Sequence, residues 1–155
     1  MQAKVPRLKL SPMEPYSFYR LRKWKVLENY VFYVECIDRR CFIPRGFVFD
    51  GATVPRIFQW LYSPVGILLI PSLFHDFAYE YGYLLIKTDD GEPEEYGHEL
   101  DRADFDKIFY NITVQMYDQR IYAWIAYIFT RFFGFASYKG TRYRGPRHYK
   151  EVKDG

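Results

Sequence analysis

The 155-residue sequence is poor in cysteine and has no long apolar run, and each scarcity excludes a class of protein. The two cysteines, Cys36 and Cys41, are too few for a disulfide framework or a complete zinc site, so we expect reduced structural thiols. No apolar run reaches the roughly 18 residues that a membrane-spanning helix needs. Residues 1–10 carry basic side chains without an apolar stretch behind them, so we expect a soluble chain without a secretory signal.

The net charge is also small, but the charged residues are unevenly distributed along the chain. A formal charge of +3 does not by itself indicate a nucleic-acid partner. Acidic residues gather in 89–95, whereas basic residues alternate with tyrosines in the tail, 139–155. Such a tail is typical of a solvated extension, and it is also compatible with docking on an acidic neighbouring subunit, a membrane surface or nucleic acid.

Aromatic residues are abundant, with 16 tyrosines and 14 phenylalanines. Rings in this number either fill the interior or coat a contact surface. The length suffices for one hydrophobic core. We therefore expect a single domain over 1–155, with its core at about 16–138 and a basic extension over 139–155.

Strand-forming residues come first along the chain. Residues 30–34 and 41–43 predict an antiparallel meander of two or three strands, which the Pro-Gly stretch 44–46 ends. Residues 47–49 predict a last extended piece, and Asp50-Gly51 is typical of a tight turn.

Helical patterns follow the strands. We expect a short helix over 53–60, a helix over 72–81 closed by Gly82, and longer helices over 99–117 and 119–133. The polar stretch from Lys87 to Gly97 predicts a mobile loop. Strands followed by helices predict an α+β fold, in which a small N-terminal antiparallel β-meander precedes a bundle of three to four helices.

A His-Asp pair lies in the helix expected over 72–81. His75 and Tyr79 are four residues apart and share a helix face, whereas Asp76 projects about 100° away. The neighbours are apolar, so we expect a partly buried imidazole. A single histidine in such surroundings is most often a satisfied core residue, and only the nearby carboxylates favour a site.

Asp104 interrupts an apolar i, i+4 row of the helix expected over 99–117. A buried carboxylate needs a partner or a proton. The sequence offers Arg56, Arg102 and His75 as partners. Pairing with His75 would fix the imidazole tautomer and make its other nitrogen a useful base, whereas pairing with an arginine would only hold two helices together.

Asp50 and Asp76 are candidate metal ligands. Carboxylates with turn carbonyls suit a hard cation such as Ca²⁺ or Mg²⁺, and together with His75 they are also compatible with a transition metal. The spacing does not discriminate between these ions, and a plain turn cap at Asp50 is equally compatible with the sequence.

Four segments carry a resemblance to a known family: 49–56, 75–79, 102–109 and 131–134. In this order they resemble domain-of-unknown-function family 1353, uncharacterised proteins of tailed bacteriophages and prophages, whose pattern is roughly TDGASVPR, HDxxY, RxxAD and a terminal RxxG. Phe49 and Thr53 depart mildly from the first motif. The resemblance covers about 30–138 and implies a phage-encoded protein, but it brings no established activity.

A fainter likeness is to secreted phospholipase A2, in which a helix bearing HDxxY faces a second helix whose aspartate holds the catalytic histidine. This likeness implies that His75 activates water and that Asp104 orients it. It further implies that Tyr79 hydrogen-bonds Asp104 and that Asp76 binds calcium. The disulfides and the Gly- and Cys-rich calcium loop of those enzymes are missing here, and with them the oxyanion hole.

Two main functions are compatible with these features. The first is a virion-associated structural component, of the tail or another part of a phage particle, with other virion proteins as partners and the His/Asp cluster as a polar core network. The alternative is a small metal-assisted hydrolase of lipid or cell-envelope bonds, with His75 as general base and a divalent cation such as Ca²⁺. A binder of membrane surfaces or nucleic acid through the tail is a third. We expect the protein in the virion or the host cytoplasm.

Overall fold

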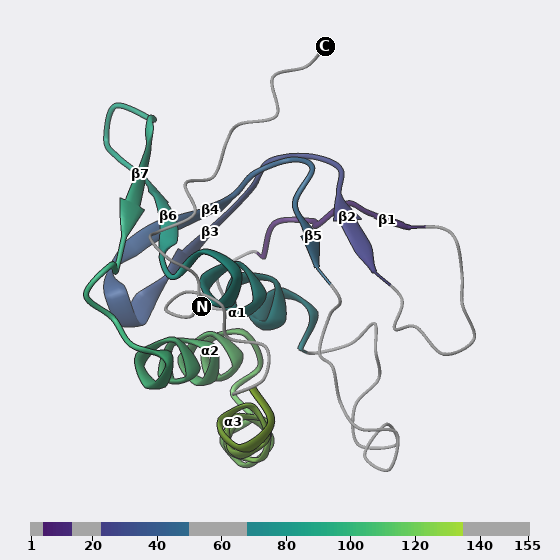
Figure 1. Ribbon diagram of the computed structural model, residues 1–155, viewed down its shortest axis with the longest axis vertical. Coiled ribbons are helices and arrows are strands. Elements are labelled where there is room, and N and C mark those ends of the chain that lie inside the picture. Colours follow the sequence, from purple (N-terminus) through teal and green to yellow (C-terminus); the bar gives the residue numbers. More distant parts are fainter. Residues whose placement is uncertain (1–4, 14–22, 50–67, 135–155) are drawn as a thin grey trace.

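The computed structural model of the protein describes residues 5–13, 23–49 and 68–134, and these ranges form two antiparallel sheets and three α-helices (Figure 1). Strands precede most of the helical residues, which confirms the predicted α+β class. The helix predicted over 53–60, the turn at Asp50 and the tail 139–155 lie outside the described residues.

The larger sheet has the strand order β3-β4-β6-β7, with antiparallel neighbours throughout. Its strands are β3 (Tyr30–Val34), β4 (Arg39–Ile43), β6 (Leu84–Lys87) and β7 (Pro93–Tyr96). The first two confirm the predicted meander, and they join through a short 3₁₀ turn.

The hairpin of β6 and β7 corrects the prediction of a mobile loop from Lys87 to Gly97. Leu84 pairs with Tyr96 and Ile86 with Glu94, so apolar and acidic residues share one ladder. Because β7 is an edge strand, its charged side chains reach solvent and its acidic composition does not oppose pairing.

The smaller sheet has the order β1-β2-β5 and consists of β1 (Leu10–Pro12), β2 (Trp24–Val26) and β5 (Val48–Phe49). The chain enters it from the larger sheet by a bend at Gly46, whose φ of 89° suits glycine. The Gly46 amide donates to the carbonyl of Val26 at 2.8 Å, which holds the two sheets in continuity.

The helices are α1 (Leu69–Tyr81), α2 (Arg102–Tyr117) and α3 (Arg120–Phe133). Three of the predicted helices are confirmed, and α1 ends as predicted at Gly82, which has a φ of 80°. The second begins three residues later than predicted because Asp101 caps it: its carboxylate accepts from the Asp104 amide, and the Asp104 carboxylate accepts from the Asp101 amide.

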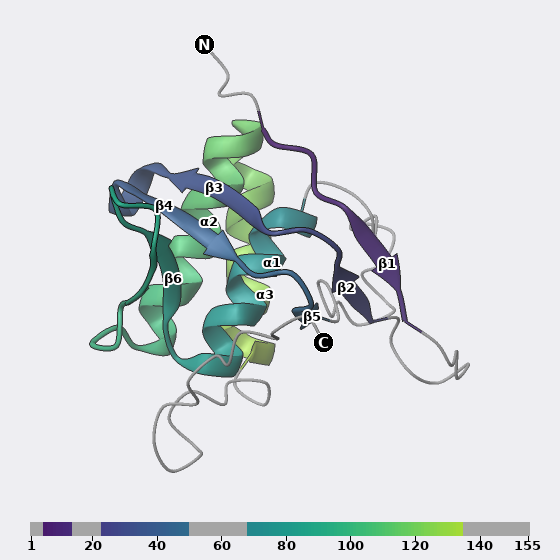
Figure 2. The same ribbon diagram turned by 90° about the horizontal axis from the view of Figure 1, so that it is seen from above.

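The helices form successive layers beside the larger sheet. α1 packs against this sheet, α2 packs against α1, and α3 packs against α2 (Figures 1 and 2). Aromatic side chains such as Phe74, Phe77 and Tyr83 fill the core and are at most 1% exposed, which confirms an aromatic interior.

Two further features bear on the predictions. Both cysteines are free thiols; Cys36 is exposed and Cys41 is buried, and burial raises the pKa of the Cys41 thiol to about 12. Among the helices that the structure describes, none has the length and apolar character needed to cross a membrane.

Candidate functional site

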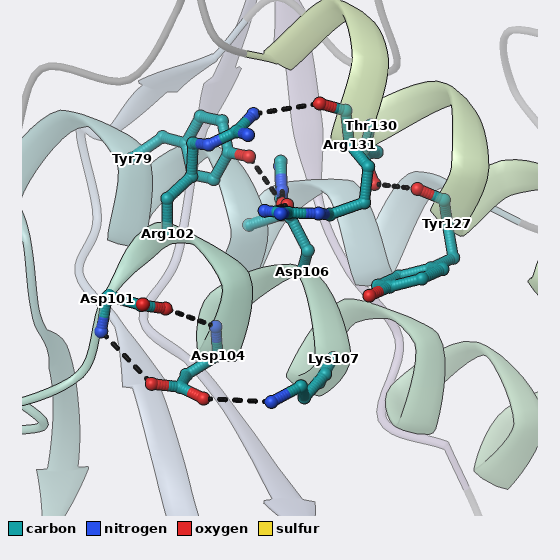
Figure 3. A network of polar contacts seen from close by, with 10 residues as sticks. Tyr79, Asp101, Arg102, Asp104, Asp106, Lys107, Tyr127, Thr130 and Arg131 are labelled. Atoms are coloured by element: carbon teal, nitrogen blue, oxygen red, sulfur yellow. Dashed lines mark hydrogen bonds and ion pairs between the residues drawn. The ribbon is translucent and has the colours of Figure 1, made fainter.

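The carboxylate of Asp106, on α2, is the centre of the candidate site and is 0% exposed. It accepts hydrogen bonds from Nε2 of His75 at 2.8 Å, from the Tyr79 hydroxyl, and from Nη1 of Arg131 at 3.2 Å. Figure 3 shows Tyr79 and Arg131 pointing toward it from opposite sides. Because these donors come from α1 and α3, one buried acid joins all three helices.

These contacts define the protonation of the imidazole. A carboxylate with three donors around it is an acceptor, so Nε2 of His75 carries a hydrogen and Nδ1 is the nitrogen that gains or loses a proton. Nδ1 lies 4.0 Å from Oδ1 of Asp76. The ring therefore stands between two carboxylates, and His75 retains 8% of its exposure to solvent.

The shifts in pKa follow from this arrangement. Burial lowers the pKa of His75, but the interactions with Asp106 and Asp76 outweigh it, and the net shift is upward. Burial raises the pKa of Asp106, but its bonds with His75, Tyr79 and Arg131 outweigh it, and the net shift is downward. Both net shifts favour an imidazolium-carboxylate pair. Burial, and then the bond to Asp106, raises the pKa of Tyr79.

The C-terminal end of α3 completes the site. Arg131 binds Asp106 through its side chain, and its carbonyl accepts from Nη1 of Arg102 at 3.0 Å (Figure 3). Gly134, at the C-cap, packs directly under Tyr79: a Cβ at Gly134 would lie 2.8 Å from the tyrosine hydroxyl oxygen. A glycine at this position thus permits the close approach.

The prediction that Asp104 contacts His75 and Tyr79 is wrong. Asp104 occupies the third position of α2, where its carboxylate binds the Asp101 amide and Lys107, and its side chain is 38% exposed. Asp106 lies two residues further on, about 200° around the helix. The acid that holds the histidine is therefore on the opposite face from the capping acid.

The sequence contained a signal for Asp106. In the pattern RxxAD the aspartate follows the arginine by four residues, and counting from Arg102 reaches Asp106, with Phe105 in the place of alanine. Arg131, whose role was also missed, begins the RxxG segment. Residues from three of the four motif segments thus meet around one carboxylate.

Metal binding at Asp50 and Asp76 stays a prediction. Asp50 lies outside the described residues, and Asp76 is 24% exposed beside His75. Within the part of the chain that the structure describes, no group of three or more His, Cys, Asp or Glu residues is arranged to hold a metal ion.

The geometry supports two kinds of role. A histidine whose Nε2 is held by a buried carboxylate presents Nδ1 as a general base. The same buried ion pair also holds helices together. Separating the helices would leave the buried acid without one of its partners, which is strongly destabilising.

A model of the family described as "Protein of unknown function (DUF1353)" matches residues 24–129. The matched range includes His75, Tyr79 and Asp106 and ends before Arg131. No curated protein and no solved structure matches the chain.

The close packing at Gly134 leads to a prediction. Gly134 has a φ of −67°, so alanine is allowed there and would otherwise be neutral or stabilising. The added methyl group would collide with Tyr79, and we expect Gly134→Ala to lower the free energy of unfolding by about 1–3 kcal/mol. Urea denaturation measures this. In a double-mutant cycle, Tyr79→Phe should relieve part of the loss; two additive effects would contradict the contact.

The raised pKa of His75 predicts a pH-dependent stability. Because the folded pKa exceeds the unfolded one, protonation of His75 stabilises the fold fully below about pH 6.5, and this stabilisation is lost as the pH rises through the folded pKa. We expect His75→Gln to cost about 1–3 kcal/mol near pH 6 and less near pH 9. The difference between the free energies of unfolding of wild type and variant at each pH isolates the effect of His75, because the contributions of the other titratable groups cancel in that difference. A pH-independent difference would contradict the shift.

Proposed function

This chain belongs to the DUF1353 family of proteins of unknown function, and we propose that it is a hydrolase in which His75 acts as general base. One observation carries the proposal: Nε2 of His75 is 2.8 Å from a fully buried carboxylate, which leaves Nδ1 as its basic nitrogen. Without this partner His75 would lose the contact that fixes its tautomer and the largest contribution that raises its pKa.

The proposed step is the hydrolysis of an ester bond. Water transfers a proton to Nδ1 of His75 as its oxygen attacks the carbonyl carbon, and the resulting imidazolium returns the proton to the oxygen of the leaving alcohol. The products are a carboxylic acid and an alcohol. Asp106 is a positioning residue, which stays ionised and stabilises the imidazolium, while Tyr79 and Arg131 hold its carboxylate in place.

The surroundings of the imidazole favour a lipid or cell-envelope ester as substrate. The ring centroids of Tyr79 and Phe109 lie 3.9 Å and 5.2 Å from that of His75. Aromatic rings next to the imidazole suit an acyl group better than a strongly polar substrate.

We expect His75→Gln to lower hydrolysis about 100-fold or more, because it removes the proton acceptor. The assays are fatty-acid release from phosphatidylglycerol vesicles and the cleavage of p-nitrophenyl esters. Wild-type activity should rise with pH through the pKa of His75, because only the neutral imidazole accepts a proton.

His98→Gln is the matched control for this experiment. His98 also pairs with a carboxylate, that of Glu95 at 2.7 Å, but it lies exposed beyond β7. This variant should keep full activity. Wild-type protein that is inactive on both substrates, or a His75→Gln variant as active as wild type, would refute the proposal.

The burial of the same site favours a second candidate, a structural component of a phage particle. Asp106 and His75 are almost withdrawn from solvent, and the donors around Asp106 are used inside the protein, as in a polar core that only holds helices together. On this proposal the partners are other virion proteins.

The structural proposal predicts that the protein stays with intact phage particles through a density gradient, in a constant ratio to the major capsid protein. Quantitative mass spectrometry of the particle band measures this ratio. His75→Gln particles should contain the same amount, because the expected loss of about 1–3 kcal/mol leaves most of the protein folded and attachment to a particle needs no proton acceptor at His75. Absence of the protein from washed particles would exclude this role.

A further inference from the structure

The outer face of α3 carries an apolar stripe, which we define as Ile121, Trp124, Ile128 and Phe132. Ile121, Trp124 and Phe132 are 79%, 56% and 77% exposed, and Ile128 is partly exposed. Their spacing of three, four and four residues places all four side chains on one side of the helix.

The opposite side of α3 explains why the stripe faces outward. Ala123 and Ala126 are 0% and 2% exposed and form the side that packs toward α2. These small residues allow close approach of the two helices. Ile125 and Phe129 pack against the cluster around Ala126, whereas the four side chains of the stripe lie on the far side. In a helix of a globular protein the apolar stripe normally faces the core, and here a second stripe faces solvent.

The charges on and after α3 indicate which kind of partner would cover this stripe. No acidic residue occurs in α3, and Arg120 is exposed at its first turn. The sequence that follows, 135–155, contains six basic residues and two acidic ones. An apolar helix face with tryptophan, next to a strongly basic sequence, is complementary to a lipid surface with anionic headgroups.

A second copy of the chain fits the stripe less well. A stable protein interface involves about 20 residues on each side, whereas the stripe has four on a single helix. At 14 residues α3 is also too short to cross a bilayer, so it would lie in the plane of the interface.

We propose that the outer face of α3 binds the surface of an anionic membrane, with the stripe inserted at the headgroup level. This binding does not depend on the hydrolase proposal, because it needs neither His75 nor Asp106. It requires only the folded protein and the exposed side chains of α3.

The test is sedimentation of the full chain with vesicles of phosphatidylcholine containing phosphatidylglycerol, compared with phosphatidylcholine alone. We expect binding to the anionic vesicles, and a loss of at least about tenfold in partitioning for the variant Ile121→Ser/Trp124→Ser/Phe132→Ser. Raising the salt concentration should weaken wild-type binding as well, because the headgroup attraction is screened.

A matched variant controls for general hydrophobicity. Met13→Ser/Leu27→Ser removes apolar side chains that are 39% and 42% exposed beside the smaller sheet, far from the stripe in sequence, and should bind as wild type does. The single change Trp124→Ser gives a smaller loss and serves if the triple variant does not unfold cooperatively. Wild-type protein that stays in the supernatant, or equal binding by the folded stripe variants, would overturn the proposal. A protein that forms a dimer through the stripe and does not bind vesicles would also overturn it.

Discussion

The fold depends on keeping one buried negative charge satisfied. Asp106 has no exposed surface, and a carboxylate withdrawn from water is tolerated only with donors on its oxygens. Those donors come from α1 on one side and α3 on the other, so the positions of three helices are coupled through a single side chain. Apolar burial is non-directional, whereas hydrogen bonds to a buried charge require a defined distance and direction for each donor.

The need to satisfy Asp106 also explains the contacts of Gly134 and Arg102 and the orientation of α3. The Tyr79 hydroxyl that binds Asp106 lies so close to Gly134 that a side chain at that position would collide with it. Arg102 donates a hydrogen bond to the carbonyl of Arg131 near the end of α3. With this end of α3 held by polar contacts and its middle packed on α2 around Ala123 and Ala126, the stripe of Ile121, Trp124, Ile128 and Phe132 faces outward. The polar site and the outer stripe are thus two consequences of how one helix is docked.

Regular local patterns were predictable. The strands β3 and β4, the glycine at the end of α1 and the three described helices each follow from the nearest neighbours in sequence. The hairpin of β6 and β7 was missed because an acidic composition indicates a loop, while the decisive contribution is pairing with β4, which lies some forty residues earlier in the chain. Long-range pairing of this kind leaves little trace in local composition.

The residue types of the site, a histidine and a tyrosine one turn apart and an aspartate on a later helix, were readable from the amino acids alone, because helical spacing places such side chains on defined faces. Which aspartate meets the histidine was not. Asp104 and Asp106 are two residues apart, and the choice between them depends on where α2 begins, since Asp101 draws Asp104 into its cap and turns Asp106 inward. Only the docking of α2 between α1 and α3 brings Arg131 to the same carboxylate, because that contact joins residues 25 positions apart and requires α3 to fold back along α2.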